Sequence, residues 1–255
     1  MTETGPEFLT VGTGSAARRI AVRVREGSGP PIVWLSGFRS DMTATKAMAL
    51  DAWAAETGHK LVRFDYAAHG SSTGTFTACT ISTWLEDAEA ILNAYVLAAP
   101  ILVGSSMGGW IACLAARARV RRGQAIAGLV LIAPALDFTE TLIWNRLSEE
   151  ARALLIRDKV LNAPSAYAPE PDPITLNLIE DGRSNCILDG TLDLGGPVHI
   201  LQGMRDTDVP HTHALKILDH LPAEGTVLTL IADGDHRLSR PQDITRLIAA
   251  VSEIA

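Results

Sequence analysis

The sequence predicts an α/β protein with a mostly parallel central sheet that is covered by helices on both faces. Short apolar runs alternate with segments of helical periodicity along nearly the whole chain, as in successive β-α-β units. Most of these runs are continuously apolar, as expected of strands that are buried on both faces. The 255 residues are enough for one large domain or two small ones, and we interpret residues 1–255 as a single domain.

The predicted elements follow one another in regular order. Arg18–Arg25 alternates between polar and apolar residues, which is typical of a half-exposed strand. Buried strands are expected after it at residues 32–35, 60–66, 101–104, 126–133, 198–201 and 226–232. Helices are expected between and after them, at residues 45–56, 80–96, 107–119 and 240–254, with another that begins near residue 211.

The alternation stops between the strands expected at residues 126–133 and 198–201. The intervening residues contain a helical stretch, Glu140–Asp158, and a proline-rich segment, APSAYAPEPDP. A loop of this length inside a compact domain usually has a function. We therefore interpret residues 136–190 as a small cap inserted over the active site. The alternative is a surface excursion without a function.

Composition excludes several classes of protein. A net charge of −7 does not favour binding to nucleic acid or to an anionic membrane surface. No apolar run approaches the roughly 20 residues that span a bilayer, and the first residues do not resemble a signal peptide. The 3 cysteines are too few and too scattered for a disulfide framework or a zinc site. We expect a cytoplasmic protein without a metal.

The segment Gly104-Ser105-Ser106-Met107-Gly108 fits the pattern G-x-S-x-G. It follows a buried strand and precedes a helix, which is the context of a nucleophile elbow. Glycines on both sides remove the side chains that would collide in so tight a turn. We therefore expect Ser106 to be a nucleophile at the N-terminus of a helix, where developing negative charge is stabilised. Ser105 is adjacent but does not occupy the central position.

A serine nucleophile needs a base, and His236 is the candidate. It lies in Asp-Gly-Asp-His, after the last apolar strand and before the final helix. The base in turn needs a carboxylate that orients it. Asp206 and Asp208 both follow the strand expected at 198–201, and we prefer Asp206, because Asp208 suits a turn or a helix N-terminus.

Two backbone N–H groups are needed to stabilise a tetrahedral oxyanion. Met107, immediately after the nucleophile, is the first candidate. The second is Phe38, because Gly37 lets the loop after residues 32–35 approach closely. Arg39, next in that loop, either contacts a carboxylate of the substrate or pairs with Asp41.

Six segments carry a resemblance to a known family: LSGFRSDM, TKAMAL, FDYAAHGSS, GSSMGGW, GMRDTDVP and DGDH. Together they resemble the α/β-hydrolases grouped around the mitochondrial acyl-glucuronide esterase and palmitoyl-protein thioesterase, roughly from Pro31 to His236. The resemblance implies Ser106, Asp206 and His236 as nucleophile, acid and base. LSG and AAHG depart from the usual forms of these segments, which puts substrate preference in doubt. His69, in the second of these departures, resembles a structural turn residue.

These observations predict a serine hydrolase that cleaves a small-molecule carboxylic ester or thioester without a cofactor. A peptidase or a C–C bond hydrolase would use the same three side chains, and a non-catalytic binding protein of this fold is a further alternative. A dehalogenase would carry aspartate in place of Ser106. Arg39, Trp144 and Tyr167 are candidate substrate contacts. The other histidines are expected to be structural or exposed, with His211 and His213 at the surface.

Overall fold

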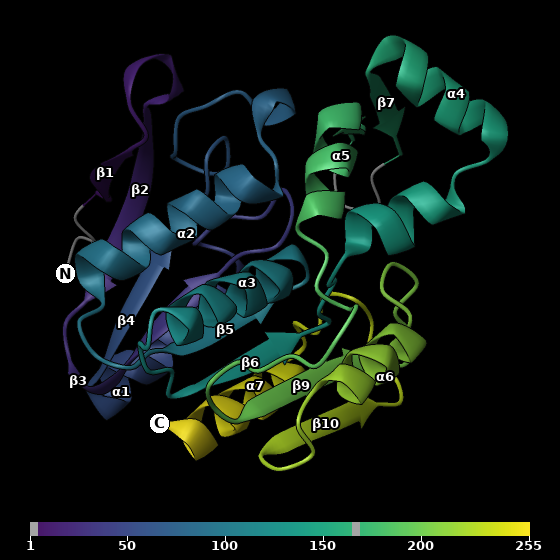
Figure 1. The fold of residues 1–255 in the computed structure, drawn as a ribbon. Coiled ribbons are helices and arrows are strands. Elements are labelled where there is room, and N and C mark those ends of the chain that lie inside the picture. The colour runs from purple at the N-terminus through teal and green to yellow at the C-terminus, as the bar shows by residue number, and fades with distance from the viewer. Residues whose placement is uncertain (1–4, 165–168) are drawn as a thin grey trace.

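The computed structural model describes residues 5–164 and 169–255, and its centre is an eight-stranded sheet in the order β1-β2-β4-β3-β5-β6-β9-β10 (Figure 1). The strands are β1 (Glu7–Val11), β2 (Arg18–Arg25), β3 (Ser28–Leu35), β4 (His59–Phe64), β5 (Ile101–Ser105), β6 (Gly128–Ile132), β9 (Val198–Gly203) and β10 (Thr226–Ile231). β2 runs antiparallel to both β1 and β4, and every pairing from β4 to β10 is parallel. The prediction of an α/β fold with a mostly parallel sheet is confirmed.

Helices cover both faces of this sheet. They are α1 (Thr45–Thr57), α2 (Ile81–Tyr95), α3 (Met107–Arg121), α6 (His211–His220) and α7 (Pro241–Ile254). α1 and α7 cover one face, while α2, α3 and α6 cover the other (Figure 1). Successive β3 residues divide between the two apolar cores, with Val33 in one and Trp34 in the other, as the alternation of strand side chains requires.

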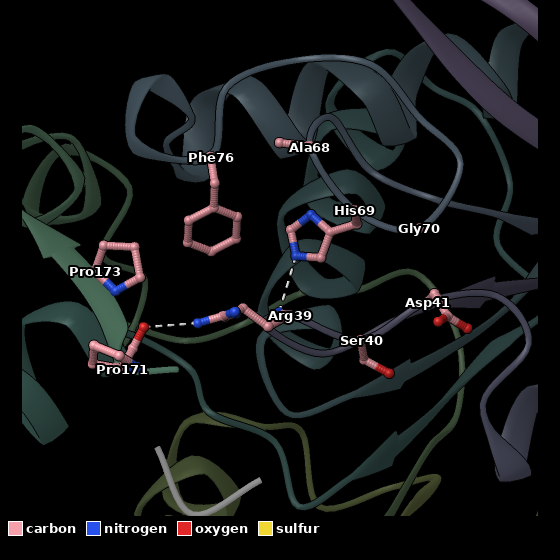
Figure 2. Close-up of a pocket in the computed structure, with 9 residues that line it drawn as sticks. All are labelled: Arg39, Ser40, Asp41, Ala68, His69, Gly70, Phe76, Pro171 and Pro173. Carbon is pink, nitrogen blue, oxygen red and sulfur yellow. Dashed lines mark hydrogen bonds between the residues drawn. The ribbon is translucent and has the colours of Figure 1, made fainter. Parts of the chain in front are cut away.

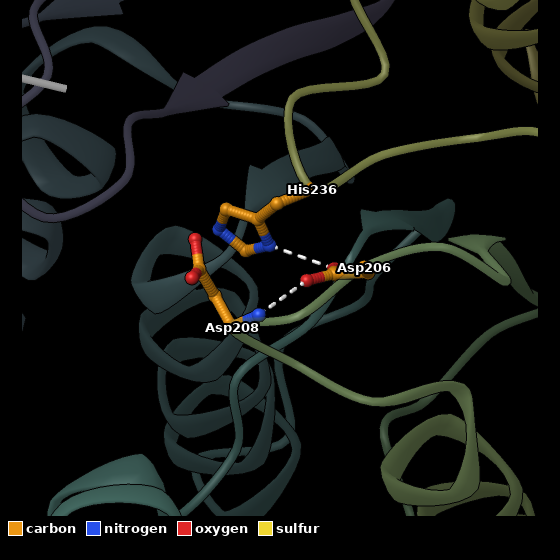
Figure 3. A group of neighbouring side chains, drawn as sticks. All are labelled: Asp206, Asp208 and His236. Carbon is orange, nitrogen blue, oxygen red and sulfur yellow. Dashed lines mark hydrogen bonds and ion pairs between the residues drawn. The ribbon is translucent and has the colours of Figure 1, made fainter. Parts of the chain in front are cut away.

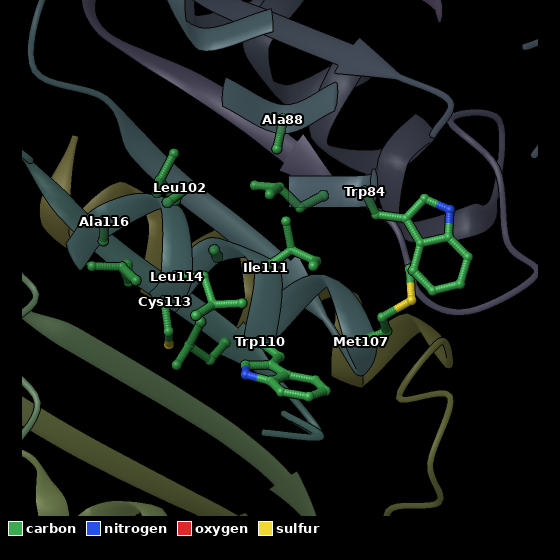
Figure 4. Packing of buried hydrophobic residues seen from close by; sticks show 14 of the residues in the cluster. Trp84, Ala88, Leu102, Met107, Trp110, Ile111, Cys113, Leu114 and Ala116 are labelled. Carbon is green, nitrogen blue, oxygen red and sulfur yellow. The ribbon is translucent and has the colours of Figure 1, made fainter. Parts of the chain in front are cut away.

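The larger core lies under α2 and α3, beside the turn that carries Ser106. Met107, Trp110 and Ile111 on α3 are fully buried and belong to one apolar core with Trp84 of α2 (Figure 4). Helix α2 is initiated by Thr80, whose hydroxyl accepts a hydrogen bond from the Thr83 amide. The first turn of α3 is thus anchored in a close-packed interior.

An inserted segment follows β6 and lies beside one end of the sheet (Figure 1). Its elements are a π-helical turn (Thr139–Ile143), a 3₁₀ turn (Trp144–Arg146), α4 (Glu149–Asp158), the antiparallel strands β7 (Val160–Ala163) and β8 (Asp172–Thr175), and α5 (Leu176–Ser184). It has a small apolar core of its own, formed by Leu155, Ile174, Leu176 and Ile179. We keep the name cap for residues 136–190, and the division of the chain into one domain with a cap remains our interpretation.

Several elements differ from the sequence predictions. The helical stretch expected at Glu140–Asp158 is broken, because the Ser148 hydroxyl accepts a hydrogen bond from the Ala151 amide and so starts α4 as a separate helix. β1, β7, β8 and α5 were not predicted. Among the described residues, no helix is both long and apolar enough to cross a membrane.

Candidate active site

The turn between β5 and α3 holds Ser106 in a strained conformation. Its φ of 55° and ψ of −118° lie in a region that residues with side chains rarely adopt. Glycines permit the surrounding approach: a Cβ on Gly104 would overlap the Gly108 carbonyl, and one on Gly108 would overlap the Leu35 carbonyl. This is the geometry of a nucleophile elbow.

The structure brings Ser106, His236 and Asp206 together from three loops at the carboxyl ends of strands. His236 Nε2 lies 3.1 Å from the Ser106 hydroxyl oxygen, and His236 Nδ1 lies 2.8 Å from Asp206 Oδ2. The Asp206 carboxylate is fully buried, and the His236 side chain is 15% exposed. A proton can therefore pass from the hydroxyl to an imidazole that is held by a carboxylate.

Several donors fix the carboxylate of Asp206. Its Oδ1 accepts hydrogen bonds from the amides of Asp208 (2.9 Å) and Val209 (2.8 Å). Its Oδ2 accepts one hydrogen bond from the buried side-chain amide of Gln202 (3.1 Å) and another from His236 Nδ1 (2.8 Å). Gln202 was not singled out from the sequence, although a polar residue near the carboxyl end of an otherwise apolar strand could have pointed to the site.

Asp208 also lies near the imidazole (Figure 3). Asp206, Asp208 and His236 are the one group among the described residues whose His, Cys, Asp or Glu side chains could share a metal ion, with ligand atoms within 4.8 Å of one another. Both nitrogens of the imidazole are already engaged, one with Asp206 and the other with Ser106. A metal would have to displace one of these contacts.

The two predicted oxyanion donors flank Ser106. Met107 is the first residue of α3, and Phe38 follows β3 in the neighbouring loop. Gly37 lets that loop lie against the elbow, because a Cβ there would be 3.3 Å from the Ser105 carbonyl oxygen. Within residues 5–164 and 169–255, the amides of Phe38 and Met107 donate no hydrogen bond to a backbone carbonyl. Their role in stabilising an oxyanion stays a prediction.

Two cavities of different chemistry meet at Ser106 and His236. One, of about 440 Å³, has mostly apolar walls, including Phe38, Phe138, Leu142, Ile143, Leu147, Leu161, Ile174 and Val209. The other, of about 370 Å³, is mainly polar, with Arg39, Ser40, Asp41, Lys46, Arg237 and Ser239 in its walls. Burial and the charge of Arg237 lower the pKa of Lys46 to about 8. Apolar and charged parts of one substrate can thus be accommodated on separate sides of the serine.

Arg39 connects the loop after β3 to the cap. Its guanidinium donates to Asp172 Oδ1 (2.8 Å) and to the Pro171 carbonyl (2.9 Å). The observed ion pair is with Asp172, so of the two alternatives for Arg39 the pairing with Asp41 is wrong, because the side chain extends toward β8. Asp41 accepts hydrogen bonds from Thr43 instead. A contact between Arg39 and a substrate stays a prediction.

The remaining sequence candidates lie elsewhere. The guanidinium carbons of Arg183 and Arg152 lie over the Trp144 ring, 4.5 Å and 5.4 Å from its centre. Trp144 is not among the residues that line the apolar cavity. Tyr167 lies outside the described residues. His213 is buried and its Nε2 is 2.8 Å from the Leu136 carbonyl, so its interpretation as a surface residue is wrong. The cause is the packing of α6 against the segment that follows β6.

Comparisons with known proteins agree with this architecture. The bovine mitochondrial palmitoyl-protein thioesterase ABHD10 is 30% identical over 236 residues, which cover 92% of this chain and 76% of that protein. A solved structure of a presumed hydrolase from Agrobacterium vitis S4 is 50% identical, with a TM-score of 0.95 over 98% of each chain.

The mouse alpha/beta hydrolase domain-containing protein 10 is a further similar structure. It is 28% identical, with a TM-score of 0.86 over 97% of this chain and 98% of that one. Since the names of the ABHD10 relatives place them in mitochondria, the cytoplasmic location expected here stays a prediction. Residues 32–247 match the alpha/beta hydrolase family over most of the chain. The chain therefore belongs to the alpha/beta hydrolase family.

Proposed function

We propose that this protein is a serine hydrolase that cleaves carboxylic esters or thioesters through an acyl-enzyme. The observation that carries the proposal is the hydrogen-bonded chain from Ser106 through His236 to Asp206. The order of these residues along the sequence and the strained elbow are those of serine enzymes of this fold.

In the first half of the reaction His236 Nε2 takes the proton of Ser106 as the hydroxyl oxygen attacks the carbonyl carbon. The resulting oxyanion accepts hydrogen bonds from the amides of Phe38 and Met107. His236 then gives the proton to the leaving alcohol or thiol as its bond to carbon breaks. The buried Asp206 carboxylate keeps the proton of neutral His236 on Nδ1 and stabilises the imidazolium.

In the second half of the reaction water replaces the leaving group. His236 removes a proton from the water as it attacks the acyl-enzyme, and the Ser106 oxygen leaves with that proton. The products are a carboxylic acid and the regenerated enzyme. No step needs an electron donor or acceptor.

The two cavities suggest how an ester or thioester lies across Ser106. The apolar cavity suits a hydrocarbon acyl chain, because burying methylene groups there is favourable by ~0.8 kcal/mol each. The polar cavity suits the alcohol or thiol part. Thioester hydrolysis is supported by the palmitoyl-protein thioesterases among the relatives.

The test compares Ser106→Ala with Ser105→Ala. Ser105 is the matched control, because it is the neighbouring serine, whereas the hydrogen bond with His236 Nε2 is made by Ser106. We expect Ser106→Ala to lose fluorophosphonate labelling and to lose turnover of p-nitrophenyl esters and acyl thioesters by ~10⁴-fold or more. Ser105→Ala should keep both within about tenfold.

Retention of ester turnover by Ser106→Ala would refute the proposal. Failure of the wild-type protein to react with any fluorophosphonate or to hydrolyse any ester or thioester would also refute it. Mass spectrometry of the labelled protein, with the probe on Ser106, would support it directly.

A further inference from the structure

The turn after β4 contains a buried histidine, His69, that faces the loop after β3, which carries Phe38 and Arg39. The His69 Nδ1 lies 3.0 Å from the Ala67 carbonyl oxygen, and its Nε2 lies 3.0 Å from the backbone nitrogen of Arg39 (Figure 2). The ring is almost fully buried. One side chain therefore joins its own turn to the loop that follows β3.

These two contacts fix the protonation of the imidazole. The Ala67 carbonyl can only accept, so Nδ1 carries the proton, and the Arg39 amide can only donate, so Nε2 is the bare acceptor. Burial lowers the pKa of His69, and the nearby charge of Arg39 acts in the same direction. His69 is thus a neutral acceptor held in one tautomer.

The amide that donates to His69 Nε2 belongs to Arg39, whose backbone is strained. Arg39 has a φ of 55°, a left-handed conformation that is unfavourable for a residue with a side chain. Its N–H lies in the peptide group between Phe38 and Arg39, so the hydrogen bond that it donates to His69 Nε2 fixes the plane of that group. Anchoring this group fixes the chain at the Phe38 Cα, which limits movement of the preceding peptide group that carries the Phe38 N–H.

The Phe38 ring is held by the same neighbourhood. It packs edge-on against Phe76 at 5.0 Å and Trp84 at 5.9 Å. The His69 ring contacts both of these aromatic rings as well, at 5.4 Å and 5.5 Å. The side chain of Phe38 and the peptide group after it are therefore fixed by one connected set of buried groups.

We propose that His69 is a positioning residue for the oxyanion hole, because its Nε2 anchors the peptide group after Phe38 and so holds Phe38 where its N–H points at the oxyanion. The proposal rests on the proposed function, in which this N–H stabilises the tetrahedral intermediate. A lost oxyanion donor typically costs ~10²–10³-fold in rate, so a misaligned one should cost about 10–100-fold.

A matched pair of variants isolates the bond to Arg39. His69→Leu removes the acceptor, whereas the amide oxygen of His69→Gln can still reach the Arg39 N–H. The Ala67 carbonyl stays satisfied in both, because it also accepts a hydrogen bond from Trp84 Nε1 at 3.2 Å. A second loss variant, His69→Asn, keeps a polar group near Ala67 but is too short to reach Arg39.

We expect kcat for a p-nitrophenyl ester to fall about 10–100-fold in His69→Leu and His69→Asn, with KM within about twofold. His69→Gln should remain within about threefold of the wild type. Affinity for a trifluoromethyl ketone, which Ser106 converts to a tetrahedral adduct, should fall in parallel with kcat. Affinity for the matching alkyl p-nitrophenyl ether, which has no carbonyl oxygen to accept from the Phe38 N–H, should not change. A general loosening of the fold would weaken the binding of both ligands.

Equal losses in the Leu and Gln variants, or an unchanged affinity for the trifluoromethyl ketone in His69→Leu and His69→Asn, would refute the positioning role. Such results would leave the proposed function intact as long as the wild type hydrolyses the ester and Ser106→Ala does not. An inactive wild type would instead refute the proposed function and, with it, the positioning role.

Discussion

The sheet side and the cap side of the candidate site are built in different ways. On the sheet side, Ser106, Asp206 and His236 follow strands, and each is fixed by short hydrogen bonds or by backbone geometry. On the cap side, the apolar cavity is closed by side chains from short helices and a two-stranded sheet. The polar link from Arg39 to Pro171 and Asp172 is one of several hydrogen bonds between the two sides.

We infer from this difference that the sheet side holds the reacting groups and that the cap side determines which substrates are accepted. Strand ends in a close-packed sheet can hold reacting groups to a fraction of an ångström, which proton transfer requires. A cap with a small core of its own can change its side chains without moving those groups. We therefore expect substitutions on the sheet side to change the rate for every substrate, and those on the cap side to change which acyl chains are accepted.

The largest effect on the sheet side is expected for Asp206→Asn, with a fall in kcat of ~10⁴-fold for all esters. The Asp208 and Val209 amides hold one side-chain oxygen, so the new NH₂ group would face His236. The imidazole would then carry its proton on Nε2 and could not act as a base toward Ser106. Steady-state kinetics with short-chain and long-chain p-nitrophenyl esters would measure the loss.

Asp208→Asn is the matched control, since Asp208 is the alternative carboxylate near the same imidazole. We expect it to keep kcat within about tenfold. A loss in Asp208→Asn that equals the loss in Asp206→Asn would mean that the two carboxylates share the role of the acid.

The sheet side was also the part that the sequence predicted best. Continuous apolar runs fixed the order of the buried strands, and local turn residues located Ser106, Asp206 and His236 at their ends. The short β1 has no such signal, because its pairing with β2 depends on the rest of the sheet. His213 was misassigned for a similar reason, because the Leu136 carbonyl that it contacts is brought near it only by the packing of a distant segment. Asp206, by contrast, is close to Gln202 along the chain, but the residue types alone do not show that the Gln202 side chain turns toward it.

The cap was predicted only as an insertion with one helical stretch, Glu140–Asp158. Its strands pair with each other across a proline-rich segment, and neither is long enough to give a clear period-two pattern. The partner of Arg39 could not be chosen from sequence either. Asp41 is close along the chain, but the extended arginine side chain reaches Asp172, which is distant in sequence.

On the cap side, an intermediate effect is expected for Leu142→Trp. Leu142 lines the apolar cavity, and a larger ring there would occupy the space of a long acyl chain. We expect kcat/KM for p-nitrophenyl laurate to fall about 10–100-fold and that for the butyrate to stay within about threefold. Leu154→Trp, on the exposed surface of α4, is the control and should leave both values unchanged. Equal losses for the two esters would contradict the assignment of this cavity to the acyl chain.

The smallest effect on catalysis is expected for a substitution of Asp51, a buried carboxylate on the sheet side that lies away from Ser106 and pairs with two arginines. Asp51 on α1 contacts Arg25 at 2.8 Å and Arg63 at 3.2 Å. Burial alone would raise the pKa of Asp51, but the hydrogen bonds and charges of the two arginines lower it below its usual value. We expect Asp51→Asn to reduce the free energy of unfolding by about 2–3 kcal/mol at neutral pH and to leave kcat within about twofold.

The loss caused by Asp51→Asn should depend on pH. Because the pKa is lower in the folded protein than the value of ~3.9 in an unfolded chain, the contribution of Asp51 is fully present above the unfolded value. It disappears as the pH falls through the folded value, where both states are protonated. Urea unfolding of both proteins at neutral pH and at pH values below ~4 would measure this convergence.

Glu26→Gln provides the comparison for Asp51→Asn, because the pair between Glu26 and Lys60 is at the surface, with a distance of 3.2 Å. Its removal should change the free energy of unfolding by less than about 1 kcal/mol. A pH-independent loss in Asp51→Asn would mean that packing of the side chain, rather than its charge, stabilises α1 against the sheet. A fall in kcat of more than tenfold in Asp51→Asn would instead mean that the packing of α1 against the sheet affects the position of Ser106. The reacting groups would then depend on parts of the fold far from the site.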